Sequence, residues 1–369
     1  MDKAYISLGS NEGQRLKNLQ EAVVQIQKQV GVLTDLSSLY ETPAWGFEGP
    51  DFLNACIGVK TDFLPSELLQ KLLKIERKMG RLRTSETGYK SRNIDLDLLF
   101  FEDHVIENDD LILPHPRLEL RNFILYPMCE IAPDFVHPRL GKDMAHLLNF
   151  CGDTSHPSQL PLSQWSSDIF FEDQLLVFEG NIGVGKTSLT QKIARDFKVP
   201  SLLENFSSNP YLEKFYEQPD RFALSLENYF LEDRFRQFDN FIKESTSQNM
   251  TVADHSLFKS LVFAKINLST KDFQDFKANY ERLSAQFVFK QKVIFLHQPL
   301  EKLMKQIKSR GRTYEQNITR DYLEKIEEGY QNFQEEHWST PFNRIDLNNL
   351  DFIDDERAYQ ILLHRIKAF

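Results

Sequence analysis

Apolar residues in the first part of the chain follow two spacings, one typical of strands and one typical of helices. Short apolar runs at residues 4–8, 36–41, 54–61 and 94–101 predict strands. Amphipathic helices are predicted by apolar residues that recur every three or four positions, namely Leu16, Leu19, Val23, Ile26 and Val30, then Leu68, Leu69, Leu72 and Ile75. Because strands and helices interleave over short connections, we expect an α+β fold here.

The pattern changes in the second half of the chain. Strand-like runs at residues 175–179, 201–204, 250–254, 293–297 and 344–347 alternate with long helical stretches, which predicts an α/β domain with a parallel sheet. Between the halves, residues 151–165 are rich in Ser, Pro, Gly, Thr and Gln and lack apolar periodicity. We therefore expect a first domain at 1–150, a linker at 151–170 and a second domain at 171–369.

Composition narrows the classes of partner. The formal net charge is −10 and the pI is about 5.5, which argues against nucleic-acid and anionic-membrane partners. Three widely spaced cysteines suit reduced thiols in a cytosolic protein better than a disulfide framework or a zinc site. The chain enters a strand-like run at once, so we expect no signal peptide. No run approaches the roughly 18 apolar residues of a membrane span.

The strongest chemical signal is a glycine-rich stretch in the second half. Residues 180–187 fit the pattern G-x-x-x-x-G-K-[ST], between a predicted strand and a predicted helix. We expect its backbone to hold phosphate oxygens, Lys186 to neutralise their charge, and Thr187 to ligate Mg²⁺. The residues expected to contact the nucleotide are Gly180, Asn181, Gly183, Gly185, Lys186, Thr187 and Ser188. The alternative is a glycine-rich turn that binds nothing, but the flanking strand and helix favour a nucleoside triphosphate.

The first half carries a second candidate site. Asp95 and Asp97 alternate with apolar residues and would share one strand face about 7 Å apart. Two such carboxylates favour a cation between them, and beside phosphates the natural cation is Mg²⁺. Arg81 and Arg92 lie close in sequence and could contact phosphates. Taken alone, the short Asp-x-Asp pattern fits an edge strand with two solvated aspartates better.

The sequence around the two aspartates favours a metal site over solvated side chains. The first half resembles 6-hydroxymethyl-7,8-dihydropterin pyrophosphokinases in short stretches that occur in the expected order, at residues 5–11, 40–43, 51–55, 80–83, 91–97, 114–117, 121–123 and 130–133. The resemblance implies a ferredoxin-like fold and transfer of pyrophosphate from ATP to the pterin hydroxymethyl group. By that resemblance Asp95 and Asp97 would hold Mg²⁺. The implied phosphate ligands are Arg81, Arg83, Arg92, His115 and Arg121. The implied pterin contacts are Thr42, Pro43, Asn54 and Phe123, although Phe123 alone would be taken for a core aromatic.

Charged residues also follow the phosphate loop. Glu204 and Asp254 each end a predicted strand, where parallel sheets bind ligands. Arg310 and Arg312 flank a glycine in a segment suited to a lid over a triphosphate. Each residue has a plain alternative, as a helix-terminal acid or a solvated charge.

Together these residues resemble the deoxynucleoside kinase family over roughly residues 175–369. The matching stretches are residues 178–188, 203–205, 209–216, 226–235, 254–256, 310–312 and 315–318. The resemblance implies that Glu204 is the base on the sugar 5′-hydroxyl, that Arg234 orients that hydroxyl, and that Asp254 helps hold Mg²⁺. It also implies that Phe263, which alone would be read as a core residue, stacks on the nucleobase, and that the lid arginines grip phosphates.

Two positions depart from that family. Many members have an arginine where this chain has His255, so a weaker, titratable cation would replace it near the phosphates. Glu227 falls where some members place a base-reading glutamine.

The sequence thus predicts a cytosolic fusion of two ATP-using enzymes. One is a pterin pyrophosphokinase, and the other is a deoxynucleoside kinase with a purine preference that forms a homodimer. The expected partners are small molecules, namely pterin, deoxynucleoside and ATP with Mg²⁺. One rival interpretation makes the second half a nucleotide-binding regulatory or oligomerisation module without catalysis. Another, nucleic-acid binding by the basic loop at residues 81–92, fits the overall acidity poorly.

Overall fold

The computed structural model describes residues 1–44, 46–81, 91–167, 175–244, 250–287, 291–337 and 343–369. The chain divides into two compact units, one formed by residues 1–170 with 354–369 and the other by residues 171–353. In the described ranges, no helix is both long and apolar enough to cross a membrane.

The first unit is built on an antiparallel sheet. Its strands run in the order β5-β1-β4-β3-β8, and β2 also pairs with β4. Their bounds are β1 (Asp2–Ser10), β2 (Val32–Leu36), β3 (Leu39–Thr42), β4 (Phe52–Thr61), β5 (Asp95–Phe101) and β8 (Ser158–Leu160). The strands expected at residues 4–8, 54–61 and 94–101 and the α+β class are confirmed, whereas the run expected as one strand at 36–41 falls across the end of β2 and most of β3. A short hairpin, β6 (Ile106–Glu107) and β7 (Ile112–Leu113), follows the main strands.

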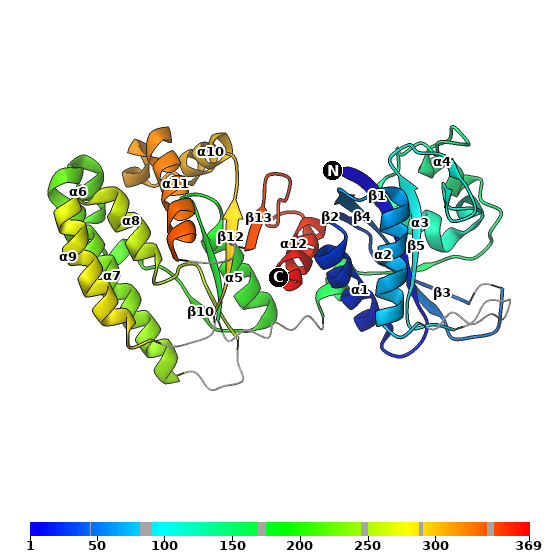
Figure 1. Ribbon diagram of the computed structural model, residues 1–369, viewed down its shortest axis with the longest axis horizontal. Helices are drawn as coiled ribbons and strands as arrows, with labels where there is room; N and C mark the ends of the chain where they lie inside the picture. Colours follow the sequence, from blue (N-terminus) through cyan, green and yellow to red (C-terminus); the bar gives the residue numbers. More distant parts are fainter. Residues whose placement is uncertain (45, 82–90, 168–174, 245–249, 288–290, 338–342) are drawn as a thin grey trace. The chain divides into compact units, whose positions relative to one another are not determined.

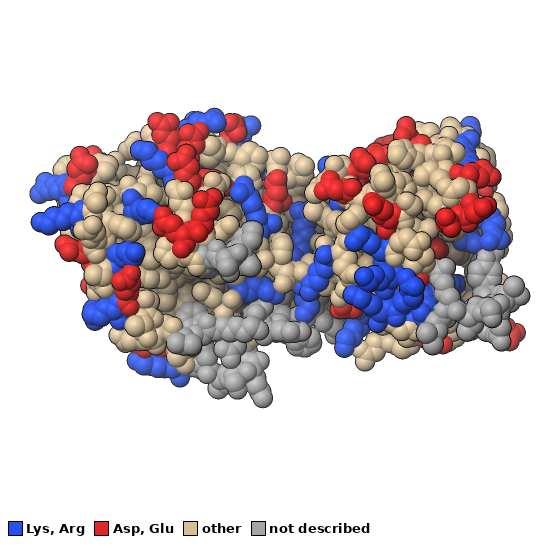
Figure 2. Space-filling view, in the orientation of Figure 1, with Lys and Arg blue, Asp and Glu red and all other residues tan. Residues whose placement is uncertain are grey.

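The first two helices of the first unit form where the apolar spacing predicts them. α1 (Arg15–Gln29) and α2 (Pro65–Lys78) contact each other and the sheet, as Figure 1 shows. Pro65 suits the first turn of α2, and the backbone N–H of Leu64 donates to Glu67 Oε2 at 2.9 Å. Basic side chains gather over α2 in Figure 2. Arg77 and Lys78 lie in the last turn of this helix, where they complement its dipole. α3 (Asn122–Ile131) packs against β4 and against α4 (Met144–Asn149).

The last helix of the chain belongs to the first unit. α12 (Glu356–Ala368) contacts α1, β2 and the 3₁₀ turn at Leu162–Ser166. Its Leu362 and Leu363 are fully buried, and Arg365 Nη2 donates to the carbonyl of Leu33 at 2.6 Å. Trp165 is also fully buried, and its indole N–H donates to the carbonyl of Ser37 at 2.8 Å.

These contacts divide the chain differently from the expected domain boundaries. The segment expected as a linker, 151–170, contributes a buried tryptophan and the edge strand β8 to the first unit. The expected second domain, 171–369, loses its last helix to the first unit. The physical reason is that apolar spacing predicts a buried helix face without saying which core receives it.

The second unit contains the expected parallel sheet. Its strand order is β10-β11-β9-β12-β13, and every pair is parallel. The strands are β9 (Leu175–Gly180), β10 (Ser201–Leu202), β11 (Thr251–Ala253), β12 (Gln291–His297) and β13 (Asn343–Asp346). The helices are α5 (Lys186–Phe197), α6 (Leu212–Glu217), α7 (Pro219–Glu244), α8 (Lys259–Asn267), α9 (Thr270–Ser284), α10 (Leu300–Arg310) and α11 (Arg320–His337). In Figure 1, α7, α8 and α9 lie together beside the sheet.

Candidate active sites

The first site is a cavity of about 270 Å³ at one end of the antiparallel sheet. Strand register assembles it, because Gly9 on β1 lies between Asn54 on β4 and Asp95 on β5. A Cβ atom at Gly9 would come within 3.0 Å of Asn54 Oδ1, so glycine keeps this approach open. The predicted residues that line the cavity are Thr42, Pro43, Asn54, Arg81, Arg92, Asp95, Asp97, His115, Arg121 and Phe123. Arg83 lies outside the described residues.

The two aspartates of β5 differ in their surroundings. Asp95 is held by Arg81 and by Arg92, whose Nη1 lies 2.7 Å from Asp95 Oδ2. Burial, and then the negative charge of Asp95, raise the pKa of Asp97 to about 7. No group of three or more His, Cys, Asp or Glu side chains suited to a metal occurs in the described part of the chain. Two carboxylates are nevertheless enough for Mg²⁺, which keeps waters and takes phosphate oxygens as its other ligands.

His115 faces the same carboxylates. Its Nε2 lies 3.9 Å from Asp97 Oδ1. Burial, followed by the charge of Arg121, lowers the pKa of His115 to about 4. The imidazole is therefore neutral at pH 7 and can donate a hydrogen bond without adding charge. Cations in the lining are Arg81, Arg92, Arg117 and Arg121.

Aromatic and amide side chains also line this cavity. Asn54 Nδ2 donates to Thr42 Oγ1 at 2.7 Å, which fixes the amide at the cavity wall. The guanidinium of Arg121 lies 5.7 Å from the ring centroid of Phe123. Phe47 and Phe52 also line the cavity, with their ring centroids 6.2 Å apart. Sequence reasoning gave neither ring a binding role, although both lie close to the motif residues of β4. A flat heterocycle with polar edges suits such a slot.

The second site is a cavity of about 350 Å³ that includes the phosphate loop. Residues 182–188 line it, so Gly183, Gly185, Lys186, Thr187 and Ser188 lie where the sequence predicts. Gly180 and Asn181 lie behind the loop, where their carbonyl oxygens accept hydrogen bonds from Lys186 Nζ at 2.7 and 2.8 Å. Gly180 has a φ of +140°, and a Cβ there would meet the carbonyl oxygen of Leu296 at 2.3 Å. The glycine therefore lets β9 pack closely on β12.

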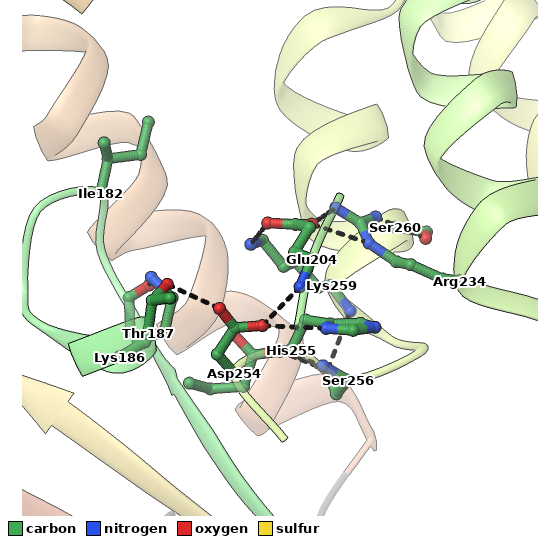
Figure 3. Close-up of polar contacts among 12 residues, drawn as sticks. Ile182, Lys186, Thr187, Glu204, Arg234, Asp254, His255, Ser256, Lys259 and Ser260 are labelled. Carbon is green, nitrogen blue, oxygen red and sulfur yellow. Dashed lines mark hydrogen bonds and ion pairs between the residues drawn. The ribbon is translucent and has the colours of Figure 1, made fainter. Parts of the chain in front are cut away.

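A buried carboxylate is held between two cations above this loop. Lys259 Nζ lies 2.6 Å from Glu204 Oε2, and Arg234 contacts Glu204 Oε1 from the other side, as Figure 3 shows. Arg234 Nη1 also donates to Ser260 Oγ at 2.7 Å. Burial opposes ionisation of Glu204, but Lys259 and Arg234 hold its pKa well below the ordinary value. Glu204 is therefore an ionised acceptor.

A second carboxylate joins this cluster to the phosphate loop. Asp254 follows β11 directly, and its Oδ2 accepts from Thr187 Oγ1 at 2.6 Å. Its Oδ1 accepts from the backbone N–H of Glu204 at 2.8 Å. A hydroxyl and a carboxylate so placed at a phosphate loop are oxygen donors of the kind that Mg²⁺ takes, so the residues present fit the expected metal.

His255 does not occupy the position that the sequence predicts for it. It is fully buried, its Nδ1 lies 3.1 Å from Asp254 Oδ1, and its ring packs on Phe238 at 5.6 Å. His255 contacts Asp254 on the side away from the cavity lining and does not itself line the cavity. The expectation that His255 replaces a cation near the phosphates is wrong, because the side chain at this position turns into the core.

Lys259 is the cation that sequence reasoning missed. It lines the cavity, begins α8 and is 5% exposed. Burial, and then the positive charge of Lys259, lower the pKa of Lys186 to about 8. The available signal was a single charge inside the apolar run 257–264, which a buried partner must neutralise.

The remaining predicted residues line the same cavity. α10 ends at Arg310 and is capped by Gly311, whose φ is +70°, and Arg310 and Arg312 on either side of this glycine both pair with Glu315. Phe263 and Glu227 line the cavity beyond Glu204, together with Phe206 and Phe230, which the sequence did not single out.

Comparisons with known proteins match the two halves of the sequence to two families, and the second match includes α12 although that helix packs in the first unit. The family model for deoxynucleoside kinases matches residues 176–369, and the model for 7,8-dihydro-6-hydroxymethylpterin-pyrophosphokinase matches residues 5–133. A pyrophosphokinase of that kind from Synechocystis sp. is 42% identical over 146 residues, which are 39% of this chain and 74% of the relative. The Aquifex aeolicus enzyme is 40% identical over 145 residues, which are 39% of this chain and 89% of the relative.

Solved structures give a weaker likeness. Deoxyadenosine kinase from M. mycoides with bound dCTP has a TM-score of 0.45 and 20% identity, over 53% of this chain and 100% of that one. The same enzyme with bound dATP has a TM-score of 0.44 and 22% identity, over 52% and 96%. The family models and the sequence relatives lead to one conclusion. The chain belongs to the hydroxymethyldihydropterin pyrophosphokinase family in its first part and to the deoxynucleoside kinase family in its second.

Proposed function

We propose that this chain is a bifunctional ATP-dependent transferase. Its first unit transfers pyrophosphate from ATP to 6-hydroxymethyl-7,8-dihydropterin, and its second unit phosphorylates the 5′-hydroxyl of a deoxynucleoside, with purines preferred. Family membership supports both activities. For the first unit, the strand order β5-β1-β4-β3 with α1 and α2 as crossovers also supports a ferredoxin-like fold.

In the first site, the carrying observation is that Asp95 and Asp97 line the same cavity as Asn54 and Phe123. These carboxylates would hold Mg²⁺, which when bound neutralises triphosphate charge. Arg92 and Arg121 bind phosphate oxygens, and neutral His115 donates a hydrogen bond to them. Asn54 and Phe123 hold the pterin, so that its hydroxymethyl oxygen can attack the β-phosphorus of ATP with AMP as the leaving group.

In the second site, the carrying observation is Glu204, which is buried, ionised and held by Lys259 and Arg234 beside the phosphate loop. The 5′-hydroxyl of the nucleoside displaces one of these contacts and donates its hydrogen bond to Glu204. Its oxygen attacks the γ-phosphorus of ATP, ADP leaves, and the hydroxyl proton passes to the carboxylate. Lys186 neutralises charge on the phosphates, while Thr187 and Asp254 would hold Mg²⁺, which supplies further positive charge when bound.

The rival interpretation is a second unit that binds nucleotide without catalysis. A weakened phosphate ligand at position 255 would favour this interpretation, but His255 is fully buried and does not line the cavity. Lys259 supplies a cation at the cavity instead. The expected homodimer through the second half rests on the resemblance alone, and light scattering of the purified chain tests it.

Glu204→Gln tests the kinase proposal most sharply. The variant keeps the side-chain size but accepts protons poorly, so we expect unchanged ATP binding and a loss of about 10²-fold or more in kcat. Glu213→Gln, on the exposed face of α6, is the matched control and should keep full activity. If Glu204→Gln turns over deoxynucleosides at the rate of the parent chain, Glu204 is not the base.

A further inference from the structure

One carboxyl in the second cavity has an oxygen without a partner. Glu227 lies on α7, is 1% exposed and lines the cavity. Its Oε1 accepts a hydrogen bond from Asn267 Nδ2 at 2.7 Å. Its Oε2 is buried and has no hydrogen-bond partner among the residues that the structure describes. A buried polar atom without a partner is unfavourable, which indicates that a ligand completes it.

The position of Glu227 suits the base end of a nucleoside. Glu227 and Arg234 are seven residues apart on α7, which places them on one helix face about 10 Å apart along the axis. Arg234 contacts Glu204, the proposed acceptor for the 5′-hydroxyl. Phe230 lies between them in sequence and lines the cavity with Phe263. A nucleoside with its 5′-oxygen at Glu204 therefore extends its base between aromatic rings toward Glu227.

A short hydrogen-bond chain fixes the orientation of the carboxyl. The hydroxyl of Tyr322 donates to Asn267 Oδ1 at 3.1 Å, so the amide nitrogen of Asn267 is directed to Glu227 Oε1. Oε1 is then an acceptor, and a proton on the carboxyl resides on Oε2. The unpartnered atom is a donor when Glu227 is protonated and an acceptor when Glu227 is ionised.

The four common nucleobases differ at the ring nitrogen of their pairing edge. Adenine and cytosine present an unprotonated nitrogen, which accepts a hydrogen bond. Guanine and thymine present an N–H, which donates one. We propose that Glu227 Oε2 contacts this ring nitrogen, so that the protonation state of Glu227 sets which nucleobases the kinase site accepts. The inference rests on the proposed deoxynucleoside kinase function and names its specificity-determining residue.

Several charged and titratable groups surround Glu227. Arg234 on the same helix and Lys259 on α8 favour its ionised form, while Glu204, which follows β10, disfavours it. The phenols of Tyr216 on α6 and Tyr322 on α11 also lie close enough to feel its charge. Burial is the largest influence and raises the pKa of Glu227 to about 7. The carboxyl is therefore mostly protonated below pH 7 and ionised above it, which predicts adenine or cytosine at low pH and guanine or thymine at high pH.

The test measures kcat/KM of the full chain for deoxyadenosine, deoxycytidine, deoxyguanosine and thymidine between about pH 6 and pH 8.5. We expect the ratio of deoxyadenosine to deoxyguanosine to fall at least about tenfold across this range, with the same direction for deoxycytidine against thymidine. Glu227→Gln has no titrating group, so its ratios should stay flat. Glu232→Gln, an exposed position on α7, should keep the pH dependence of the parent chain.

Nucleoside binding, measured by calorimetry without ATP over the same pH range, separates this inference from the kinase proposal. Selective binding that changes with pH, but without turnover, would support the role of Glu227 and sink the catalytic proposal. Turnover with ratios that are flat in both the parent chain and Glu227→Gln would overturn the inference and leave the kinase proposal intact. Ratios that vary with pH equally in both proteins would also overturn it, since another group would then be responsible.

Discussion

Leu362→Ala should destabilise the pyrophosphokinase unit and leave the kinase unit unchanged, although this residue lies at the far end of the kinase half of the sequence. Leu362 is fully buried on α12, which packs on α1 and β2 of the first unit. Truncation of a buried leucine removes transfer free energy and leaves a cavity, at a cost of about 3 kcal/mol. For domains of this size each kcal/mol shifts Tm by about 2–4 °C, so we expect a fall of about 6–12 °C.

Differential scanning calorimetry of the full chain measures this effect. Two further variants show which unfolding transition belongs to which unit, without any ligand. Leu98 is buried on β5 of the first unit and Leu323 is buried on α11 of the second, so Leu98→Ala and Leu323→Ala each destabilise one unit. The transition that Leu98→Ala lowers is that of the first unit. If Leu362→Ala lowers the same transition that Leu323→Ala lowers, and leaves the other in place, α12 belongs to the kinase unit and its assignment to the first unit is wrong.

Other variants probe the charges of the kinase site. Lys259→Met keeps the stem that packs in the cavity but removes the cation beside Glu204, so kcat should fall about 10²-fold or more, with Lys259→Arg recovering part of the loss in the same assay. His255→Arg should lower the thermal stability of the kinase unit and its activity, because a larger cation would replace a fully buried ring; a fully active, stable variant would contradict its burial. ATP binding near pH 8.5 should be accompanied by uptake of a proton, because the bound phosphates raise the pKa of Lys186 from about 8. Calorimetry in buffers of different ionisation enthalpy measures this uptake, and Lys186→Ala should abolish it.

Both cavities could be located from sequence, the second by the phosphate-loop pattern itself and the first only with the resemblance to pyrophosphokinases, because the Asp-x-Asp pattern alone fits solvated side chains better. Asp95 and Asp97 alternate with buried Leu96 on one strand, so period two alone places them together. The phosphate loop likewise joins a strand to a helix, and its glycines adopt the positive φ values that the pattern implies.

The features that sequence reasoning missed depend on long-range packing. The pattern of α12 predicts a buried face, but nothing local indicates that α1 and β2 receive it. His255 and Lys259 are four residues apart, and only the start of α8 directs Lys259 into the cavity while His255 enters the core. From sequence alone, the histidine at position 255 is therefore taken for a change in the phosphate contacts, although Lys259 supplies the cation at the cavity.

The most direct test of two independent active sites is to measure both reactions on three proteins: the full chain, Asp97→Asn and Lys186→Ala. Product analysis with ATP should show AMP when the pterin is supplied and ADP when a deoxynucleoside is supplied. We expect Asp97→Asn to lose AMP formation alone and Lys186→Ala to lose ADP formation alone. Loss of both products in either folded variant would contradict two independent sites, and an absence of ADP with all four deoxynucleosides would contradict the kinase assignment.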